Sequence, residues 1–230
     1  MATRTHARPG RPSAAALASE IDGLIRAAPR ATAAVRALRR ACSRSMRDAP
    51  AGAVIGLALR LCAAPAPGRR LFAYELVRHH PAALARLGAR RLVRLGRGIA
   101  SWDAVDCFAV GLAGHAWRRR LVSDALIGRW ARSPDRWWRR AALVSTVPLN
   151  CRAQGGSGDP RRTLRVCRLL ERDRDPMVVK ALSWALRELA KRDPAAVRGY
   201  LGARAGLLDA RVRREVRNKL ETGLKNPGRR

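Results

Sequence analysis

The sequence predicts an all-α fold in which short amphipathic helices form antiparallel pairs and stack into a solenoid. Apolar residues recur at helical spacing through most of the 230 residues, and no stretch shows the alternation of a half-buried strand. About twelve helices follow one another through short connections, at roughly 35–45 residues per helix pair. That pattern is typical of HEAT-like repeats, with a compact helical bundle as the alternative.

The first half of the chain divides into a tail and several helices. Residues 1–12 are basic, contain two prolines and predict a disordered tail. Ser13 is placed to cap the first helix, whose apolar face carries Leu17, Ile21 and Leu24. The next helix carries Val35, Leu38, Cys42 and Met46, and further helices are expected over residues 50–64, 68–80 and 81–97.

Capping residues mark the helices of the second half more sharply. Three of them begin with a capping Asp directly before a Pro at the first helical position: Asp159–Pro160, Asp175–Pro176 and Asp193–Pro194. Ser101, Ser123 and the Ser133–Asp135 segment predict starts for helices over 102–117, 124–132 and 134–147, and a last helix begins near Asp209.

The positions of the helix starts and of the segments between them indicate the domain organisation. Residues 150–158 predict a flexible loop because they are rich in glycine. We expect one helical-repeat domain over residues 13–224 and a basic C-terminal tail over 225–230.

The charge balance points to a polyanionic partner. Lys and Arg number 48 against 17 Asp and Glu, which gives a formal net charge of +31. A folded domain this basic repels itself, so a partner such as nucleic acid is favoured. The hydrophobic content of 47% is too high for a disordered protein. Because no uncharged run approaches the ~18 residues of a membrane span, we expect no membrane association.

The cysteines and histidines argue against several kinds of site. There are 5 cysteines and no CxxC, which favours reduced thiols in the cytoplasm over a disulfide framework. The 4 histidines lack ligand spacing, so no metal or cofactor is expected. Cys107 and His115 are conceivable as a nucleophilic pair, but Cys107 is better explained as a small buried residue.

The tryptophans are unusually informative. Of the 6 in the chain, Trp117, Trp130 and Trp138 are expected to fill the core. Trp184 falls outside the apolar stripe of its predicted helix, so it either forms a binding surface or packs under the next repeat.

Two further positions have both a structural and a functional explanation. Trp102 and Asp106 are four residues apart and share one helix face, where Asp106 either acts chemically or forms a structural salt bridge. Trp137 and Arg140 share the next face, where Arg140 either grips a phosphate or is an ordinary solvated charge.

Three segments resemble a known family when they are taken together. They are residues 101–106 (SWDAVD), 137–143 (WWRRAAL) and 179–188 (VKALSWALRE), and residues 210–215 (ARVRRE) are similar to that family's last helix. Their residues, order and separation resemble the AlkD-type DNA alkylation repair glycosylases over roughly residues 70–222. The sequence departs from that pattern in having no aromatic residue before Phe72.

The resemblance implies a right-handed superhelix of HEAT-like repeats whose basic concave face holds double-stranded DNA. It implies a monofunctional glycosylase of base excision repair that releases cationic alkylated purines, such as 3-methyladenine and 7-methylguanine, without metal or cofactor. The matching positions make Trp102, Asp106 and Trp184 catalytic and place Arg140 at the DNA backbone. Further DNA contacts are expected from neighbouring residues, namely Trp137, Arg139, Lys180 and Arg187. We expect a monomer in the cytoplasm, associated with the nucleoid when it is bound to DNA.

Two other functions fit the charge and the helical pattern. One is a non-catalytic HEAT-like module that binds nucleic acid or an acidic protein, and the other is an arginine-rich ribosome- or RNA-associated protein. Only the glycosylase accounts for the set of Trp102, Asp106 and Trp184.

Overall fold

A computed structural model of the chain describes residues 19–21, 23–24, 32–63 and 68–228. Every regular element in these ranges is helical and none is a strand, which confirms the all-α class. No helix in the same ranges combines the length and apolar character needed to cross a membrane. Most of the helix predicted from Ser13, and the tail before it, lie outside the described residues.

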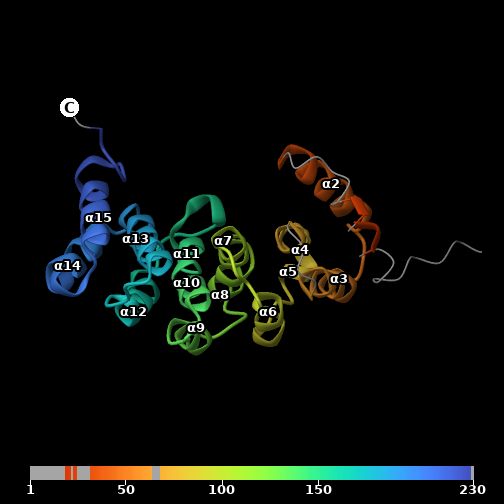
Figure 1. The fold of residues 1–230 in the computed structure, drawn as a ribbon, viewed down its shortest axis with the longest axis horizontal. Helices are drawn as coiled ribbons and strands as arrows, with labels where there is room; N and C mark the ends of the chain where they lie inside the picture. Colours follow the sequence, from red (N-terminus) through yellow and green to blue (C-terminus); the bar gives the residue numbers. More distant parts are fainter. Residues whose placement is uncertain (1–18, 22, 25–31, 64–67, 229–230) are drawn as a thin grey trace, which may run out of the picture.

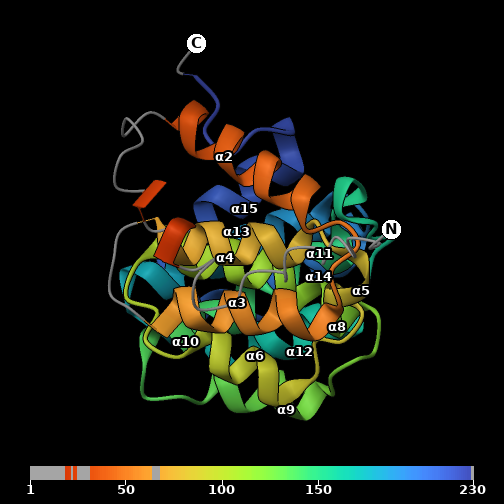
Figure 2. The ribbon, with the colours of Figure 1, turned by 90° about the vertical axis from the view of Figure 1, so that its right-hand side faces the viewer.

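The helices are stacked in two rows. One row consists of α4 (Arg69–Arg78), α7 (Trp102–Phe108), α10 (Arg136–Val144), α13 (Pro176–Ala190) and α15 (Ala210–Thr222), each packed against the next. The other contains α3 (Ala51–Ala63), α6 (Ala89–Gly96), α9 (Asp124–Ala131), α12 (Pro160–Leu170) and α14 (Pro194–Arg204). Figure 1 shows the elements following one another in chain order along the longest axis. In the view along that axis, α4 and α13 lie one behind the other, and α3, α6 and α9 lie below them (Figure 2).

Shorter elements complete these rows. Helix α2 (Thr32–Ser45) packs against α4, and α5 (Pro81–Leu84) follows the end of α4. Helix α7 continues through a π-helical segment, η1 (Ala109–Ala113), into α8 (Gly114–Arg118). The remaining elements are α11 (Val147–Asn150) and two 3₁₀ segments, η2 (Arg152–Gln154) and η3 (Ala205–Leu207).

The predicted capping residues start most of these helices. The side chains of Asp159, Asp175 and Asp193 accept hydrogen bonds from the backbone amides two or three residues later, as expected of N-caps. Asp209 and Ser123 do the same for α15 and α9. Ser101 is the exception, since it precedes α7 but its side chain makes no capping hydrogen bond.

Two predicted helices have different limits in the structure. The single helix expected over 81–97 is wrong: it is split into α5 and α6, because Leu87 is fully buried between them and Gly88 has extended backbone. The helix expected over 134–147 begins only at Arg136, where Asp135 caps it, and ends at Val144 before the separate helix α11.

The segment expected to be a flexible loop is tied down by hydrogen bonds. Buried Asn150 donates to the Thr146 carbonyl and to Thr163, and its side-chain oxygen accepts from the Asp159 amide. Gly156 lies so close to the backbone of Pro148 that an added Cβ would be 2.5 Å from the carbonyl oxygen. The connection from α11 to α12 is therefore held in place at Asn150 and Gly156, while Arg152, Ala153 and Gly155 between them are exposed.

An aromatic cluster fills the core beneath α7 and α10. The rings of Trp130 and Trp138 lie 4.8 Å apart, and Trp138 meets Phe108 edge-on at 6.1 Å. Trp117 is fully buried and donates from its indole nitrogen to Asp124 at 2.8 Å. The core assignment of Trp117, Trp130 and Trp138 is therefore confirmed.

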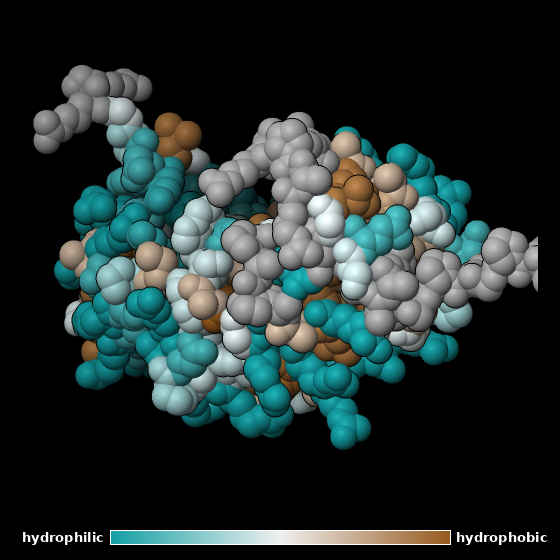
Figure 3. Space-filling model, turned by 45° about the vertical axis from the view of Figure 1, so that its right-hand side comes forward, coloured by the Kyte–Doolittle hydropathy of each residue, from teal (hydrophilic) through white to brown (hydrophobic). Residues whose placement is uncertain are grey.

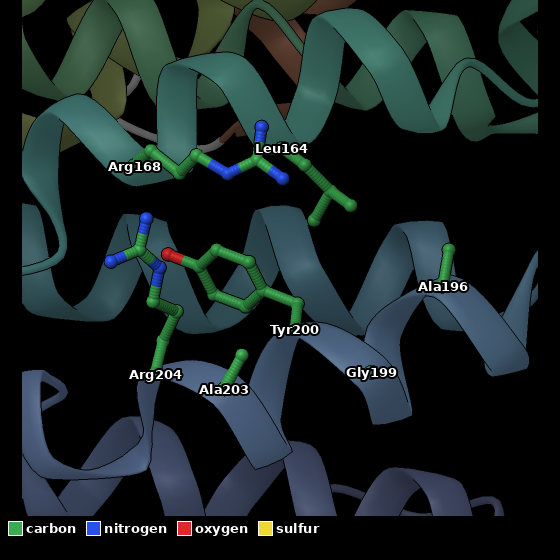
Figure 4. A pocket seen from close by; sticks show the side chains of 7 residues that line it. All are labelled: Leu164, Arg168, Ala196, Gly199, Tyr200, Ala203 and Arg204. Carbon is green, nitrogen blue, oxygen red and sulfur yellow. The ribbon is translucent and has the colours of Figure 1, made fainter.

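Near the C-terminal end, a groove of about 690 Å³ separates α12 from α14 (Figure 4). Figure 4 places the Arg204 guanidinium beside the Tyr200 hydroxyl, with Arg168 across the groove. Tyr200 donates to one Glu171 oxygen at 3.1 Å, and Arg204 lies 3.7 Å from the other. Because these polar groups satisfy one another, the groove is explained as a junction between two helices.

A substitution at Gly114 tests how closely α8 approaches the junction between α10 and α11. A Cβ at this position would lie 2.6 Å from the Ser145 carbonyl oxygen and 2.7 Å from the Pro148 ring. Backbone and proline atoms cannot move aside cheaply, so Gly114→Ala is expected to lower the free energy of unfolding by about 1–3 kcal/mol.

Gly199→Ala in α14 is the matched control, because its Cβ would meet no atom within 4 Å. It is expected to leave stability unchanged or raise it by about 0.5–1 kcal/mol through the better helix propensity of alanine. Denaturation by urea measures both variants, and equal midpoints would contradict the close packing at Gly114.

Candidate functional site

Three neighbouring helices carry the residues predicted to be functional. Helix α10 packs against both α7 and α13, so it lies between them. Each helix presents two of its polar or aromatic residues four positions apart, on one face. These pairs are Trp102 and Asp106 on α7, Arg136 and Arg140 on α10, and Lys180 and Trp184 on α13.

Arg140 connects all three helices. Its Nε donates to Asp106 Oδ1 at 2.8 Å and its Nη2 donates to Asp106 Oδ2 at 2.6 Å. Its Nη1 donates to the Met177 carbonyl, in the first turn of α13, at 2.6 Å. The guanidinium therefore grips the carboxylate with two parallel hydrogen bonds, a geometry that fixes its orientation.

The two partners of this ion pair differ in exposure. The Arg140 side chain is 7% exposed and that of Asp106 is 18% exposed, so the carboxylate is the more accessible partner. Burial raises the pKa of Asp106 because a low-dielectric environment disfavours its charged form, and the hydrogen bonds from Arg140 oppose this rise. Both carboxylate oxygens accept hydrogen bonds, as expected of the ionised form.

The two tryptophans are placed differently. Trp102 is the first residue of α7 and is 59% exposed, one helical turn before Asp106. Trp184 is half-buried on α13, where part of its side chain packs against the core and the rest is exposed. Within the described chain, the close ring–ring contacts join Tyr74, Phe108, Trp130 and Trp138, and include neither Trp102 nor Trp184.

These three helices lie within a segment shared with known proteins. A family model described as "DNA alkylation repair enzyme" matches residues 30–220. The chain belongs to this family. The comparisons with curated proteins and with solved structures give no significant match. The predicted family is thus confirmed, and DNA is the substrate that DNA alkylation repair implies.

The residues predicted to contact DNA, and those beside them, differ in their exposure. Lys180 is exposed, and so is Arg136, whose guanidinium lies over the Trp137 ring at 4.9 Å. Arg136 is not among the residues predicted from the sequence, although it lies four residues before Arg140 on the same helix face. Figure 3 shows that hydrophilic side chains cover much of the face on view.

The other predicted DNA contacts are held by neighbouring protein groups. Arg139 donates to Asp173 at 2.7 Å and to the carbonyls of Ser133 and Pro134. Arg187 donates to Ser183 at 3.2 Å, and burial lowers its pKa.

Arg140 is only 5% exposed, so its interpretation as a solvated charge is wrong. Three of its five N–H groups are bound within the protein. In this structure it holds Asp106 and is not available on the surface as a phosphate contact.

The other chemistry considered from the sequence finds no support. Burial raises the pKa of the Cys107 thiol to about 12, so it stays protonated and is a poor nucleophile. His115 pairs with the Gln154 side chain at 3.1 Å. In the ranges that the structure describes, no three His, Cys, Asp or Glu residues gather in an arrangement that could hold a metal ion.

Proposed function

We propose that this protein is a monofunctional DNA glycosylase that releases cationic alkylated purines, such as 3-methyladenine and 7-methylguanine, from duplex DNA. It acts as a monomer, without metal or cofactor, on the DNA of the cytoplasm. The observation that carries the proposal is a carboxylate, Asp106, that a buried guanidinium orients and that stays partly exposed, one helical turn from the exposed indole of Trp102.

The chemistry of these lesions suits a site with no general acid. The alkylated purine is already positive, so the electron pair of the breaking C1′–N bond neutralises it as it leaves. Positive charge then develops on the deoxyribose, water adds to C1′, and the proton of that water passes to Asp106 or to solvent. Asp106 contributes by stabilising the sugar cation and by orienting the water.

The partner charge on Arg140 decides how large this stabilisation is. A carboxylate about 4 Å from the sugar, at an effective dielectric of about 20, is worth about 4 kcal/mol. A guanidinium behind it at about 8 Å removes about 2 kcal/mol of that. The remaining electrostatic gain is a factor of about thirty in rate, and orientation of the water raises the total to about a hundredfold.

The remaining residues supply affinity. Trp102 and Trp184 would each add about 0.5–2 kcal/mol by stacking on the cationic base or sugar. Lys180 and Arg136 would meet phosphates, which fixes position without reading sequence. The net charge of +31 favours binding that weakens steeply as salt is raised.

A base-release assay tests the function. The protein is incubated with N-methylated duplex DNA in the presence of a chelator, and free purines are separated and quantified. We expect release of 7-methylguanine and 3-methyladenine well above the spontaneous rate, and no release from unmethylated duplex.

A second function is favoured by one specific observation. The pairing of Asp106 with Arg140 is also what a purely structural salt bridge would look like. If the protein binds methylated duplex without releasing any base above the spontaneous rate, the glycosylase proposal fails and a non-catalytic DNA-binding module remains.

A further inference from the structure

A basic cleft lies outside the site formed by Asp106 and Arg140. It is found where the C-terminal half of α2 faces the junction of α4 and α5. Its volume is about 430 Å³. One wall belongs to α2 and the other contains His80, which precedes Pro81. From α2 and the turn that follows it, the cleft is lined by Arg39, Arg40, Ser43, Arg44 and Arg47.

His80 lines this cleft and carries a buried, unpaired ring nitrogen. The residue is 6% exposed, and its Nδ1 accepts a hydrogen bond from the Ala83 amide at 3.1 Å. A neutral imidazole that accepts at Nδ1 carries its proton on Nε2. This buried Nε2 has no partner among the residues that the structure describes. Leaving such a donor unpaired is unfavourable, so an acceptor at this position would stabilise it.

Ser43 supplies a second unpaired group on the opposite wall. Its buried Oγ also finds no partner within the described ranges. Arg40 is three residues before Ser43, Arg44 follows it directly, and Arg47 comes four residues after it, in the turn that follows α2; all three line the cleft. None of these three arginines forms an ion pair with a residue in the described part of the chain, whereas Arg39 lies 3.9 Å from Glu75.

We propose that this cleft binds a phosphate group of the DNA backbone. Such a group is anionic and offers only acceptors, which is what two unpaired donors and three unpaired arginines require together. This inference rests on DNA binding, as DNA alkylation repair implies, and not on the glycosylase step.

A purely structural role explains only part of the cleft. Arginines near the end of α2 would stabilise the carbonyls of a helix C-terminus. That role needs neither the imidazole donor of His80 nor the hydroxyl of Ser43. The juxtaposition of these donors from two separate elements is what favours a bound oxyanion.

The test compares two double variants of the full chain. Ser43→Ala with Arg44→Gln removes one donor and one charge from the cleft. Ser45→Ala with Arg36→Gln makes the same chemical changes on the same helix at exposed positions that do not line the cleft. Thermal unfolding establishes that both variants are folded.

Affinity for an unmodified duplex is then measured as a function of salt. We expect the cleft variant to bind about tenfold more weakly at low salt, with the slope of log K against log salt reduced by about 1, as for the loss of one phosphate contact. The control is expected to keep the native slope. Equal slopes in the two variants would overturn the proposal.

Two further measurements separate the possible outcomes. The base-release rate with the duplex fully bound is expected to be the same in the cleft variant and the native protein, so a failure of the glycosylase proposal would not be mistaken for a failure of this one. Inorganic phosphate is titrated in a thermal-unfolding experiment as well. If it stabilises the native protein but not the cleft variant, while duplex affinity and slope are equal in both, the cleft takes free phosphate and the DNA assignment is wrong.

Discussion

The Asp106→Asn variant is expected to release 7-methylguanine from duplex DNA about a hundredfold more slowly than the native protein, with little change in DNA affinity. Asparagine keeps the size of the side chain and one acceptor for Arg140, but it removes the negative charge. The lost stabilisation of the sugar cation, about 2 kcal/mol after the opposing charge of Arg140 is counted, and the lost orientation of water together account for this factor. Single-turnover base release with saturating protein measures it directly.

Asp103→Asn is the matched control for this variant. Asp103 lies on the same helix and is exposed, so the same change in charge is made three residues away. We expect less than about a threefold effect from it, because an exposed charge is screened by water and salt. Similar losses in the two variants would mean that Asp106 contributes only to the general field.

The pH dependence of the native rate gives a second readout of Asp106. The ionised carboxylate is the active form, so the rate should fall as the pH falls through the pKa of Asp106. Because burial raises that pKa, the fall should begin at a higher pH than for an ordinary aspartate. The residual activity of Asp106→Asn should lack this acid limb.

The predictable parts of the fold are those that depend on interactions between residues close together in the sequence. The Asp–Pro starts at Asp159, Asp175 and Asp193 are capped as expected, because a capping side chain bonds an amide only two or three residues away. The split of residues 81–97 into α5 and α6 was not predictable in this way, since it accompanies the burial of Leu87 in the core. The π-helical turn directly precedes Gly114, whose close approach to Ser145 and Pro148 joins segments that local spacing does not relate.

For the candidate site, the sequence selects residues but not the contacts that they make. Helical spacing and family resemblance select Trp102, Asp106, Arg140 and Trp184, but they do not say which group a guanidinium meets. Asp106 and Arg140 are 34 residues apart, and the third partner is a backbone carbonyl at Met177, a group that every residue carries. Arg140 was predicted to contact a phosphate, but it bonds to Asp106 and Met177 within the protein. This difference follows from packing that sequence spacing does not encode.

Arg140→Ala is expected to have the largest effect on stability, lowering the free energy of unfolding by about 3–5 kcal/mol. The substitution leaves the Asp106 carboxylate largely buried without its counter-charge and removes the bond to the Met177 carbonyl, which links α10 to α13. Arg136→Ala is the control, because Arg136 lies one turn earlier on α10 and its side chain is 52% exposed. We expect it to change stability by less than about 0.5 kcal/mol. Chemical denaturation measures both variants.

A double variant and a conservative variant keep this prediction testable if Arg140→Ala does not fold. Combining Arg140→Ala with Asp106→Asn removes both charges, so it should recover part of the lost stability while base release stays low. Arg140→Lys retains a cation but cannot make the two parallel bonds, so it should slow base release more than it weakens DNA binding. If Arg140→Lys instead loses affinity for every duplex, with a salt slope reduced by about 1 and an unchanged base-release rate once bound, then Arg140 contacts a phosphate and its pairing with Asp106 gives way when DNA binds.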